Sequence, residues 1–136
     1  MNDLAVNDDD ADNMDIRVAL DRHWKAIDAG NLEVAHKIYQ ADAILDFPQS
    51  GERITGRDNI RDSRAAEPHR AAVAVRSILG QGDLWVTECT TSYDGDPELV
   101  VSMMEFRDGK VIHETLYFAE PFAAPKWRAK WAGTKS

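Results

Sequence analysis

The sequence predicts a single α+β domain in which helices come first and an antiparallel sheet follows. Apolar residues recur at helical spacing between residues 16 and 27. Four later segments, between residues 72 and 118, are rich in β-branched and aromatic residues. Only short turns separate these segments, so neighbouring strands are expected to run antiparallel. Helices followed by strands are typical of the α+β class, and 136 residues is the usual size of one domain.

Three helices are expected in the first half of the chain. The first begins near Asp15, an N-capping residue type, and ends at Gly30. Its inner face carries Ile16, Leu20, His23, Trp24 and Ile27. Asn31 can cap a second, shorter helix, whose inner side carries Leu32, Ala35, Ile38 and Tyr39. The third helix is expected over residues 57–66, because Pro68 disfavours helix in the residue before it.

Six strands are expected, the first two forming a hairpin. The first covers residues 43–47 and stops at Pro48, and the second runs through Arg53 and Ile54. Four longer strands follow, over residues 72–79, 84–93, 98–106 and 111–118. The turns between them read Gly80-Gln81-Gly82-Asp83, Asp94-Gly95-Asp96-Pro97 and Asp108-Gly109. A helical layer on one face of this bent sheet would leave a cavity between the two.

The two ends of the chain differ from the domain, which is expected over residues 15–124. Residues 1–14 are acidic and contain few apolar side chains, which predicts a disordered leader. Residues 125–136 are basic and predict a short amphipathic helix and tail. Trp127 and Trp131 are four residues apart and share a face of that helix. We expect them to dock on the domain or on a second subunit, and the alternative is a lid over the pocket.

Composition and charge disfavour several classes of function. The net charge is −8, and an acidic domain is a poor partner for nucleic acid. Cys89 is the sole cysteine, so nothing requires an oxidising compartment. The sequence shows no signal peptide and no apolar stretch of membrane-spanning length, which predicts a cytoplasmic protein without a membrane partner. Its histidines and Cys89 lack metal-ligand spacing and it has no glycine-rich phosphate loop, so neither a metal nor a cofactor is expected.

Four local motifs occur in order: RHWKAIDAGNL at residues 22–32, ADAI at 41–44, GRDNI at 56–60, and DGKVI at 108–112 followed by Tyr117-Phe118. They resemble the helix junction, the first strand, the start of the third helix and the final hairpin of the nuclear-transport-factor-2-like (NTF2-like) superfamily. Within it, the chain looks like a SnoaL-like, polyketide cyclase-like domain. The resemblance spans about residues 16–122. It implies a cone-shaped, cystatin-like fold, with a curved antiparallel sheet wrapped on three helices around one pocket.

The resemblance also bears on activity. Enzymes of that superfamily include ketosteroid isomerase, limonene-epoxide hydrolase, scytalone dehydratase and the SnoaL-type cyclases, whereas other members bind proteins. The tyrosine, oxyanion-holding acid and base of ketosteroid isomerase fall on His23, Ser102 and Phe47 here, and the acid of the epoxide hydrolase falls on Leu116. Neither activity is therefore expected. The class that the resemblance still implies is a cofactor-free isomerase, dehydratase or cyclase acting on a small hydrophobic carbonyl compound.

Strand alternation predicts which side chains face the pocket. If Leu116 and Phe118 point inward, Glu114 does so too. The remaining pocket residues are expected to be Ile27, Phe47, Ser102 and Met104, with Tyr39 in the wall. His23 and Glu114 would then be the polar groups of an apolar chamber. Burial should raise the pKa of the Glu114 carboxyl toward neutrality, so that Glu114 and His23 form an acid/base pair able to move a proton next to a carbonyl.

Other interpretations remain open at this point. Glu114 and His23 could instead form a buried structural ion pair. Asp46 is a third catalytic candidate, although its position in the strand points it away from the pocket and toward Arg53. At the level of the whole protein, the alternatives to an enzyme are a domain that binds a hydrophobic ligand without turnover and a protein-interaction module.

The outer face of the sheet should be partly apolar. It is expected to carry Val101, Met103, His113, Thr115 and Tyr117. Because such a mixture is too apolar to be left in water, the sequence predicts a homodimer through this face.

Overall fold

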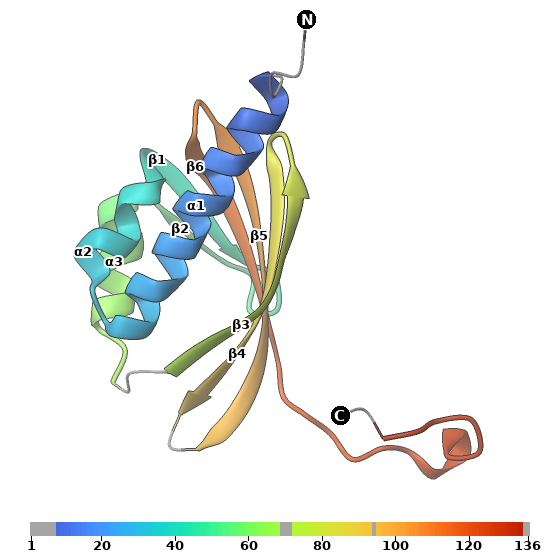
Figure 1. The fold of residues 1–136 in the computed structure, drawn as a ribbon. Helices are drawn as coiled ribbons and strands as arrows, with labels where there is room; N and C mark the ends of the chain where they lie inside the picture. The colour runs from blue at the N-terminus through green and yellow to red at the C-terminus, as the bar shows by residue number, and fades with distance from the viewer. Residues whose placement is uncertain (1–7, 69–71, 94, 135–136) are drawn as a thin grey trace, which may run out of the picture.

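The computed structural model describes residues 8–68, 72–93 and 95–134, and in these residues helices cover one face of a curved sheet (Figure 1). Helix α1 spans Asp8–Ala29, α2 spans Leu32–Ala35 and α3 spans Arg57–Ala65. Two short 3₁₀ helices, η1 at His36–Ile38 and η2 at Lys126–Arg128, complete the helical elements. The expected order of helices and strands is therefore confirmed.

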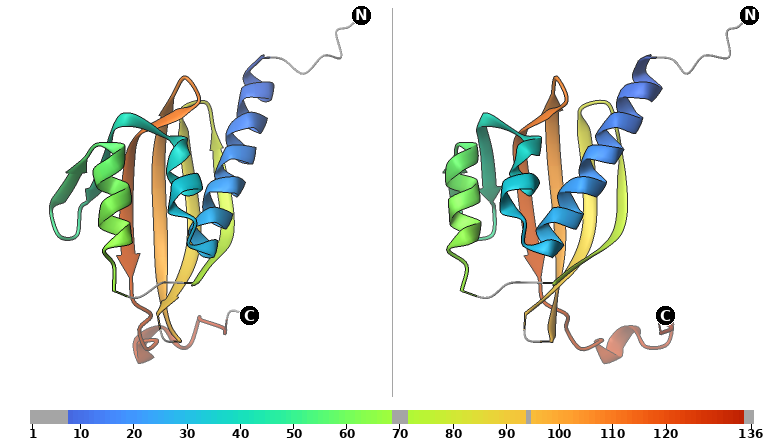
Figure 2. Two further views of the ribbon diagram at one scale, coloured as in Figure 1. Left: turned by 90° about the vertical axis from the view of Figure 1, so that its left-hand side faces the viewer. Right: turned by 60° about the vertical axis from the view of Figure 1, so that its left-hand side comes forward.

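The sheet has six strands in the order β2-β1-β6-β5-β4-β3. Their bounds are Tyr39–Phe47 (β1), Glu52–Thr55 (β2), Ala72–Gln81 (β3), Leu84–Tyr93 (β4), Asp96–Arg107 (β5) and Lys110–Ala119 (β6). Strands β3 to β6 form the expected antiparallel meander, and β1 pairs with β2 in a hairpin. The hairpin joins the meander through a parallel pairing of β1 with β6, which local turn patterns did not predict. All three helices lie on the same side of this sheet (Figure 2).

The core lies between α1 and the concave face of the sheet. Leu20 and Trp24 are one helical turn apart, so both face the sheet and are buried. Trp24 packs with its indole nitrogen donating to the Thr87 hydroxyl at 3.1 Å. Trp85 of β4 is almost fully buried on the same side. Gly80, opposite it on β3, leaves the room that the Trp85 ring requires, because a Cβ there would lie 2.7 Å from the ring.

Helix α1 begins earlier than the sequence indicated. Its first residue is Asp8, so the predicted start at Asp15 was wrong and residues 8–14 are helical. Acidic residues are favoured in a first helical turn, because the helix dipole is positive there. Asn13 also connects this end to the sheet, since its Oδ1 accepts the Gly82 N–H at 2.9 Å. Of the predicted leader, residues 1–7 lie outside the described residues.

The C-terminal tail, residues 120–134, extends away from the domain (Figure 1). It contains η2, where a short helix was expected, but Trp127 and Trp131 are 74% and 76% exposed. The expectation that they dock on their own domain is therefore wrong. The last two residues of the predicted tail, 135 and 136, lie outside the described part. No helix of the described residues is long and apolar enough to cross a membrane.

Candidate functional site

A cavity of about 770 Å³ lies between the helices and the concave face of the sheet. Four of the predicted pocket residues line it, namely Ile27, Phe47, Leu116 and Phe118. Phe47 and Phe118 stack with ring centres 6.2 Å apart. The other three predicted residues, Tyr39, Ser102 and Met104, are buried but do not line the cavity. The alternation of side chains along each strand therefore predicted correctly which face of the sheet these residues occupy. The position of a residue along its strand then decides whether its side chain reaches the cavity.

His23 lies on the cavity wall and is 2% exposed. Its Nδ1 lies 2.7 Å from the Ala35 carbonyl oxygen, which can only accept, so Nδ1 carries the proton. The other ring nitrogen, Nε2, is then a lone-pair acceptor, and no group of the described residues hydrogen-bonds it. Burial lowers the pKa of His23 to about 4, an effect that the attraction of Glu114 partly offsets. The ring is therefore neutral at pH 7.

Glu114 of β6 is fully buried, as the alternation of side chains along the strand predicted. Its carboxylate, however, is hydrogen-bonded by groups other than His23. Its Oε1 accepts from the Tyr39 hydroxyl at 2.5 Å and from Arg64 Nη2 at 3.1 Å. Its Oε2 accepts from the Ser102 hydroxyl at 2.6 Å. With both oxygens occupied, Glu114 does not line the cavity.

The expected rise in the pKa of Glu114 is wrong. Burial does favour the neutral carboxyl, but the positive charge of Arg64, the attraction of His23 and the hydrogen bonds of Ser102 and Tyr39 outweigh it. They hold the pKa below its usual value, so Glu114 is a carboxylate at pH 7. It cannot act as the proton donor of an acid/base pair, and its ion-pair partner is Arg64 rather than His23.

Arg64 of α3 is the group that sequence reasoning missed. Its Nη1 donates to the Tyr39 hydroxyl at 3.0 Å and to His36 Nε2 at 2.9 Å. His36 in turn donates from Nδ1 to the Leu32 carbonyl at 2.7 Å. Burial and Arg64 lower the pKa of His36 to about 4, which keeps it a neutral acceptor. We refer to Tyr39, Arg64, Ser102, Glu114 and His36 as the Glu114 cluster.

Thr91 of β4 is a second polar residue that the sequence did not single out. It lines the cavity, and its buried Oγ1 finds no hydrogen-bond partner in the part of the chain that the structure describes. Cys89, two residues away on the same face, also lines the cavity. Burial raises the pKa of its thiol to about 11, so it stays uncharged. A buried hydroxyl without a partner is costly, and a ligand's polar atom could satisfy it.

Asp46 lies outside the cavity, on the other face of the sheet. Its carboxylate accepts two hydrogen bonds from Arg53, at 2.7 and 2.9 Å, and contacts His113 Nε2 at 2.8 Å. Hydrogen bonding to Arg53, together with His113, holds the pKa of Asp46 well below its usual value. The expected pairing with Arg53 is confirmed, and the geometric basis for a catalytic role of Asp46 is removed.

The fold and site together define a helix-and-sheet domain with a small-molecule-sized cavity. The sequence profile of the SnoaL-like domain family matches residues 20–114, and the chain belongs to this family. An NTF2-like protein of unknown function from Burkholderia xenovorans LB400 is 51% identical, with a TM-score of 0.86 over 90% of this chain and 97% of that one. No curated protein matches the sequence significantly.

Two more distant structures show the same fold. A candidate ketosteroid isomerase from Kribbella flavida DSM 17836 is 20% identical, with a TM-score of 0.84 over 92% of this chain and 93% of that one. An epoxide hydrolase of the LEH-like type from M. tuberculosis is 17% identical, with a TM-score of 0.66 over 78% of this chain and 84% of that one. At this level of identity the similarity concerns the fold alone.

Proposed function

We propose that this protein binds a small, mostly apolar molecule in the cavity and moves a proton on it without a cofactor, with His23 as the transferring group. The observation that carries the proposal is the state of His23. Its Nδ1 is fixed by the Ala35 carbonyl, and its Nε2 has no partner in the described residues on a ring that lines the cavity. A neutral imidazole held in this way is a general base with a defined tautomer.

The proposed step is proton abstraction next to a carbonyl group. The Nε2 lone pair takes the proton, the C–H bond breaks, and its electron pair moves onto the carbonyl oxygen to give an enolate. The unpartnered Thr91 hydroxyl is the donor available to that oxygen. The imidazolium then returns the proton to another atom of the substrate. This course gives isomerisation. In dehydration the enolate instead expels a β-hydroxyl group, which takes the proton from the imidazolium and leaves as water. In aldol-type ring closure the enolate carbon attacks a second carbonyl of the substrate, and the oxygen of that carbonyl takes the proton.

Glu114 would support this step without touching the substrate, because it does not line the cavity, whereas its partner Arg64 does. The Glu114 carboxylate attracts the proton of His23, which raises the pKa of His23 against the effect of burial. Glu114 is therefore a positioning and charge-balancing residue in this proposal. Since His23 has a pKa of about 4, it is a weak base, and its substrate should carry an acidic C–H bond.

Hydrogen–deuterium exchange tests the proposal without knowledge of the natural substrate. The probe is 2-tetralone, an apolar ketone with an acidic C–H bond, and proton NMR in D₂O follows exchange at that carbon. We expect the protein to accelerate exchange and His23→Gln to reduce the acceleration at least tenfold. Glu105→Gln, on an exposed residue of the outer face, is the matched control and should exchange like the wild type. Equal rates in wild type and His23→Gln would contradict the proposal.

A second candidate function is ligand binding without turnover. The low pKa of His23 favours it, because a weakly basic imidazole serves equally well as a hydrogen-bond acceptor for a ligand hydroxyl. In this case 2-tetralone binds but its exchange rate stays at the level of the buffer. Because 2-tetralone has no hydroxyl to donate to Nε2, His23→Ala would then leave the affinity for this ketone near that of the wild type. Isothermal titration calorimetry shows whether the ketone binds, and the exchange rate of the bound ketone separates the two candidates.

A further inference from the structure

The guanidinium of Arg64 uses only part of its hydrogen-bonding capacity inside the protein. An arginine side chain carries five N–H groups in one plane. Those of Nη1 donate to the Tyr39 hydroxyl and to His36 Nε2, and one of Nη2 donates to Glu114 Oε1. The Nε–H group and the second N–H group of Nη2 remain, and neither has a hydrogen-bond partner among the residues that the structure describes.

These two N–H groups lie side by side on one edge of the guanidinium. The Tyr39 hydroxyl and Glu114 Oε1 are 2.5 Å apart, so both lie at the edge between Nη1 and Nη2. The next edge, formed by Nε and Nη2, is a fork with which an arginine binds oxygen acceptors. We refer to this pair of donors as the Nε edge of Arg64.

The position of Arg64 opens its Nε edge to the cavity. Helix α3, which carries Arg64, lies in the helical layer over the concave face of the sheet (Figure 2). Arg64 lines the cavity and its side chain is 19% exposed, whereas that of Glu114 is fully buried. Within the described residues, Thr91 Oγ1 alone is a buried side-chain nitrogen or oxygen without a partner. Arg64 Nε also lacks a partner, so it is accessible rather than buried.

We propose that the Nε edge of Arg64 binds a neutral carbonyl oxygen of the ligand. A carbonyl oxygen has two lone pairs and can accept from both N–H groups. Charge argues against a carboxylate in this place. Glu114 already balances the positive charge of Arg64, and two further carboxylates, Glu52 and Glu67, line the cavity. They repel an anionic ligand group, whereas a ketone or an ester carries no charge to be repelled.

The oxygen bound by Arg64 differs from the oxygen that takes part in the proposed proton transfer. The donor for the latter is Thr91 of β4, whereas Arg64 pairs with Glu114 of β6, and β5 lies between these strands. Neighbouring strands are about 4.8 Å apart, so two such spacings separate β4 from β6. The substrate class is then an apolar ketone with a second neutral carbonyl group. This inference rests on the cavity being a ligand site, as proposed above, but not on catalysis there.

The affinity for two matched ligands tests this site. Methyl 2-naphthoate has a carbonyl oxygen, and 2-(but-1-en-2-yl)naphthalene has a similar shape with carbon in place of both oxygens. Equilibrium dialysis gives the two dissociation constants, and Arg64→Lys should change their ratio at least tenfold in favour of the hydrocarbon. Lysine keeps a positive charge beside Glu114 but lacks the planar fork. Arg61→Lys makes the same change on α3 at a residue that does not line the cavity, and it should leave the ratio unchanged.

Three outcomes would overturn the proposal. The first is a ratio in Arg64→Lys within twofold of the wild-type ratio. The second is an ester that does not bind to the wild type up to its solubility limit. The third concerns 2-naphthoate, the corresponding carboxylate, which should bind the wild type at least tenfold more weakly than the ester. A carboxylate that binds more tightly than the ester would assign an anionic ligand group to Arg64.

NMR of the wild type keeps the test valid if Arg64→Lys does not fold. The Nε–H signal of Arg64 in ¹H–¹⁵N spectra is assigned through its side-chain carbons. Methyl 2-naphthoate should move the proton of this signal downfield, and the hydrocarbon should not; no shift at saturation with the ester would refute the contact. The ester has no C–H bond that can be enolised, so its binding is independent of the exchange of 2-tetralone. The proton transfer and the Arg64 site can therefore fail separately.

Discussion

At the scale of single residues, the position of one proton decides what the cavity can do. His23 holds its proton on Nδ1 because the Ala35 carbonyl can only accept. The other nitrogen, Nε2, has no partner among the residues that the structure describes and is therefore an acceptor, to which a ligand can supply a proton or a donor. Nearby, the Glu114 cluster keeps a carboxylate and a guanidinium paired inside the core.

Stability should fall as the pH is lowered from about 6.5 to about 4. The folded-state pKa of His23, about 4, lies below the unfolded value of 6.5, so the unfolded chain binds more protons in this window. The full loss from one such histidine is about 3 kcal/mol. Urea unfolding at pH 7 and pH 4, followed by tryptophan fluorescence, measures it. His23→Gln should lose about 3 kcal/mol less than the wild type between these pH values, and equal losses would contradict a buried neutral His23.

Glu114→Gln should destabilise the protein strongly at neutral pH. It would leave the charge of Arg64 in the core without its partner, and breaking a buried ion pair costs about 3–5 kcal/mol. Glu105→Gln, which breaks only a surface pair of β5 with His113, should change the free energy of unfolding by less than about 1 kcal/mol. If Glu114→Gln unfolds at the same urea concentration as the wild type, Glu114 is not the buried partner of Arg64.

The sequence predicted part of this site, and the missing part has a physical reason. Alternation along one strand suffices to place Glu114 inward, because it depends only on neighbouring residues. Arg64 lies fifty positions earlier on another element, and only the packing of α3 against the sheet brings it to Glu114. Without that partner, burial alone indicated a raised pKa for Glu114. Thr91 was missed for a similar reason, since an unpartnered hydroxyl cannot be recognised before its surroundings are known.

At the scale of elements, turn motifs and the alternation of side chains predicted most boundaries of the helices and strands. They did not predict where α1 and β1 begin. The aspartates of residues 1–14 suggested a repelling leader, but the helix already begins at Asp8. Sequence reasoning did not take into account that acidic residues are favoured in the first turn of a helix. Strand β1 begins at Tyr39 rather than Ala43, because its first residue already pairs with β6. This parallel pairing joins segments that are seventy residues apart, so no local pattern indicates it.

Asn13→Ala tests the longer helix directly. The Asn13 side chain accepts the Gly82 N–H of the β3–β4 turn, so its loss should destabilise the protein by about 1 kcal/mol. Asp12→Ala, on the preceding residue, changes a side chain that makes no such bond to the turn and is the control. Thermal or urea unfolding measures the difference. No difference between the two variants would indicate that residues before Asp15 are a free leader after all.

At the scale of the whole molecule, the two faces of the sheet have different surroundings. The concave face, under the helices, encloses the cavity, whereas Met103 pairs with Val86 and Thr115 on the outer face. The homodimer that the sequence predicts through the outer face would leave the cavity free for a ligand.

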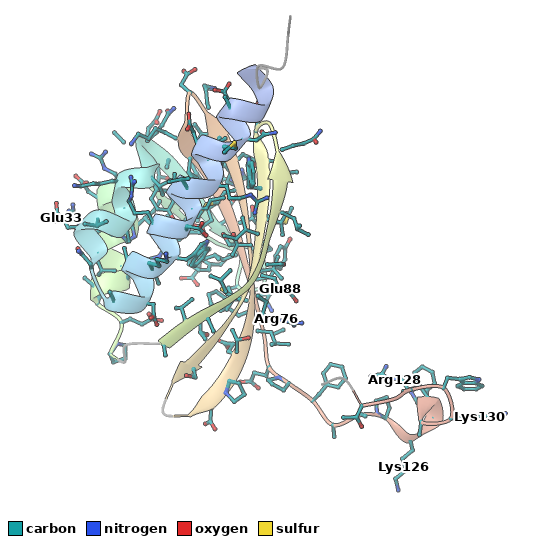
Figure 3. All side chains as sticks on the ribbon, in the orientation of Figure 1. Glu33, Arg76, Glu88, Lys126, Arg128 and Lys130 are labelled. Atoms are coloured by element: carbon teal, nitrogen blue, oxygen red, sulfur yellow. The ribbon has the colours of Figure 1, made fainter. Side chains whose placement is uncertain are left out.

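If the homodimer predicted from the sequence forms, Met103→Glu should convert it to a monomer without affecting the cavity. A carboxylate in the middle of the partly apolar outer face would be desolvated on dimerisation. Light scattering at micromolar concentration gives the mass, and Glu33→Gln, on α2 and away from the outer face (Figure 3), is the control. A Met103→Glu variant that remains dimeric would place the interface elsewhere.

The central claim, a neutral His23 with its Nε2 open to the cavity, is tested most directly by NMR of the histidine rings. Long-range ¹H–¹⁵N spectra at pH 7 distinguish the imidazolium from the two neutral tautomers. We predict the Nδ1–H tautomer for His23, and a change in its Nε2 resonance when 2-tetralone is added. An imidazolium, the opposite tautomer, or an Nε2 resonance that does not move at any concentration of the ketone would contradict the account.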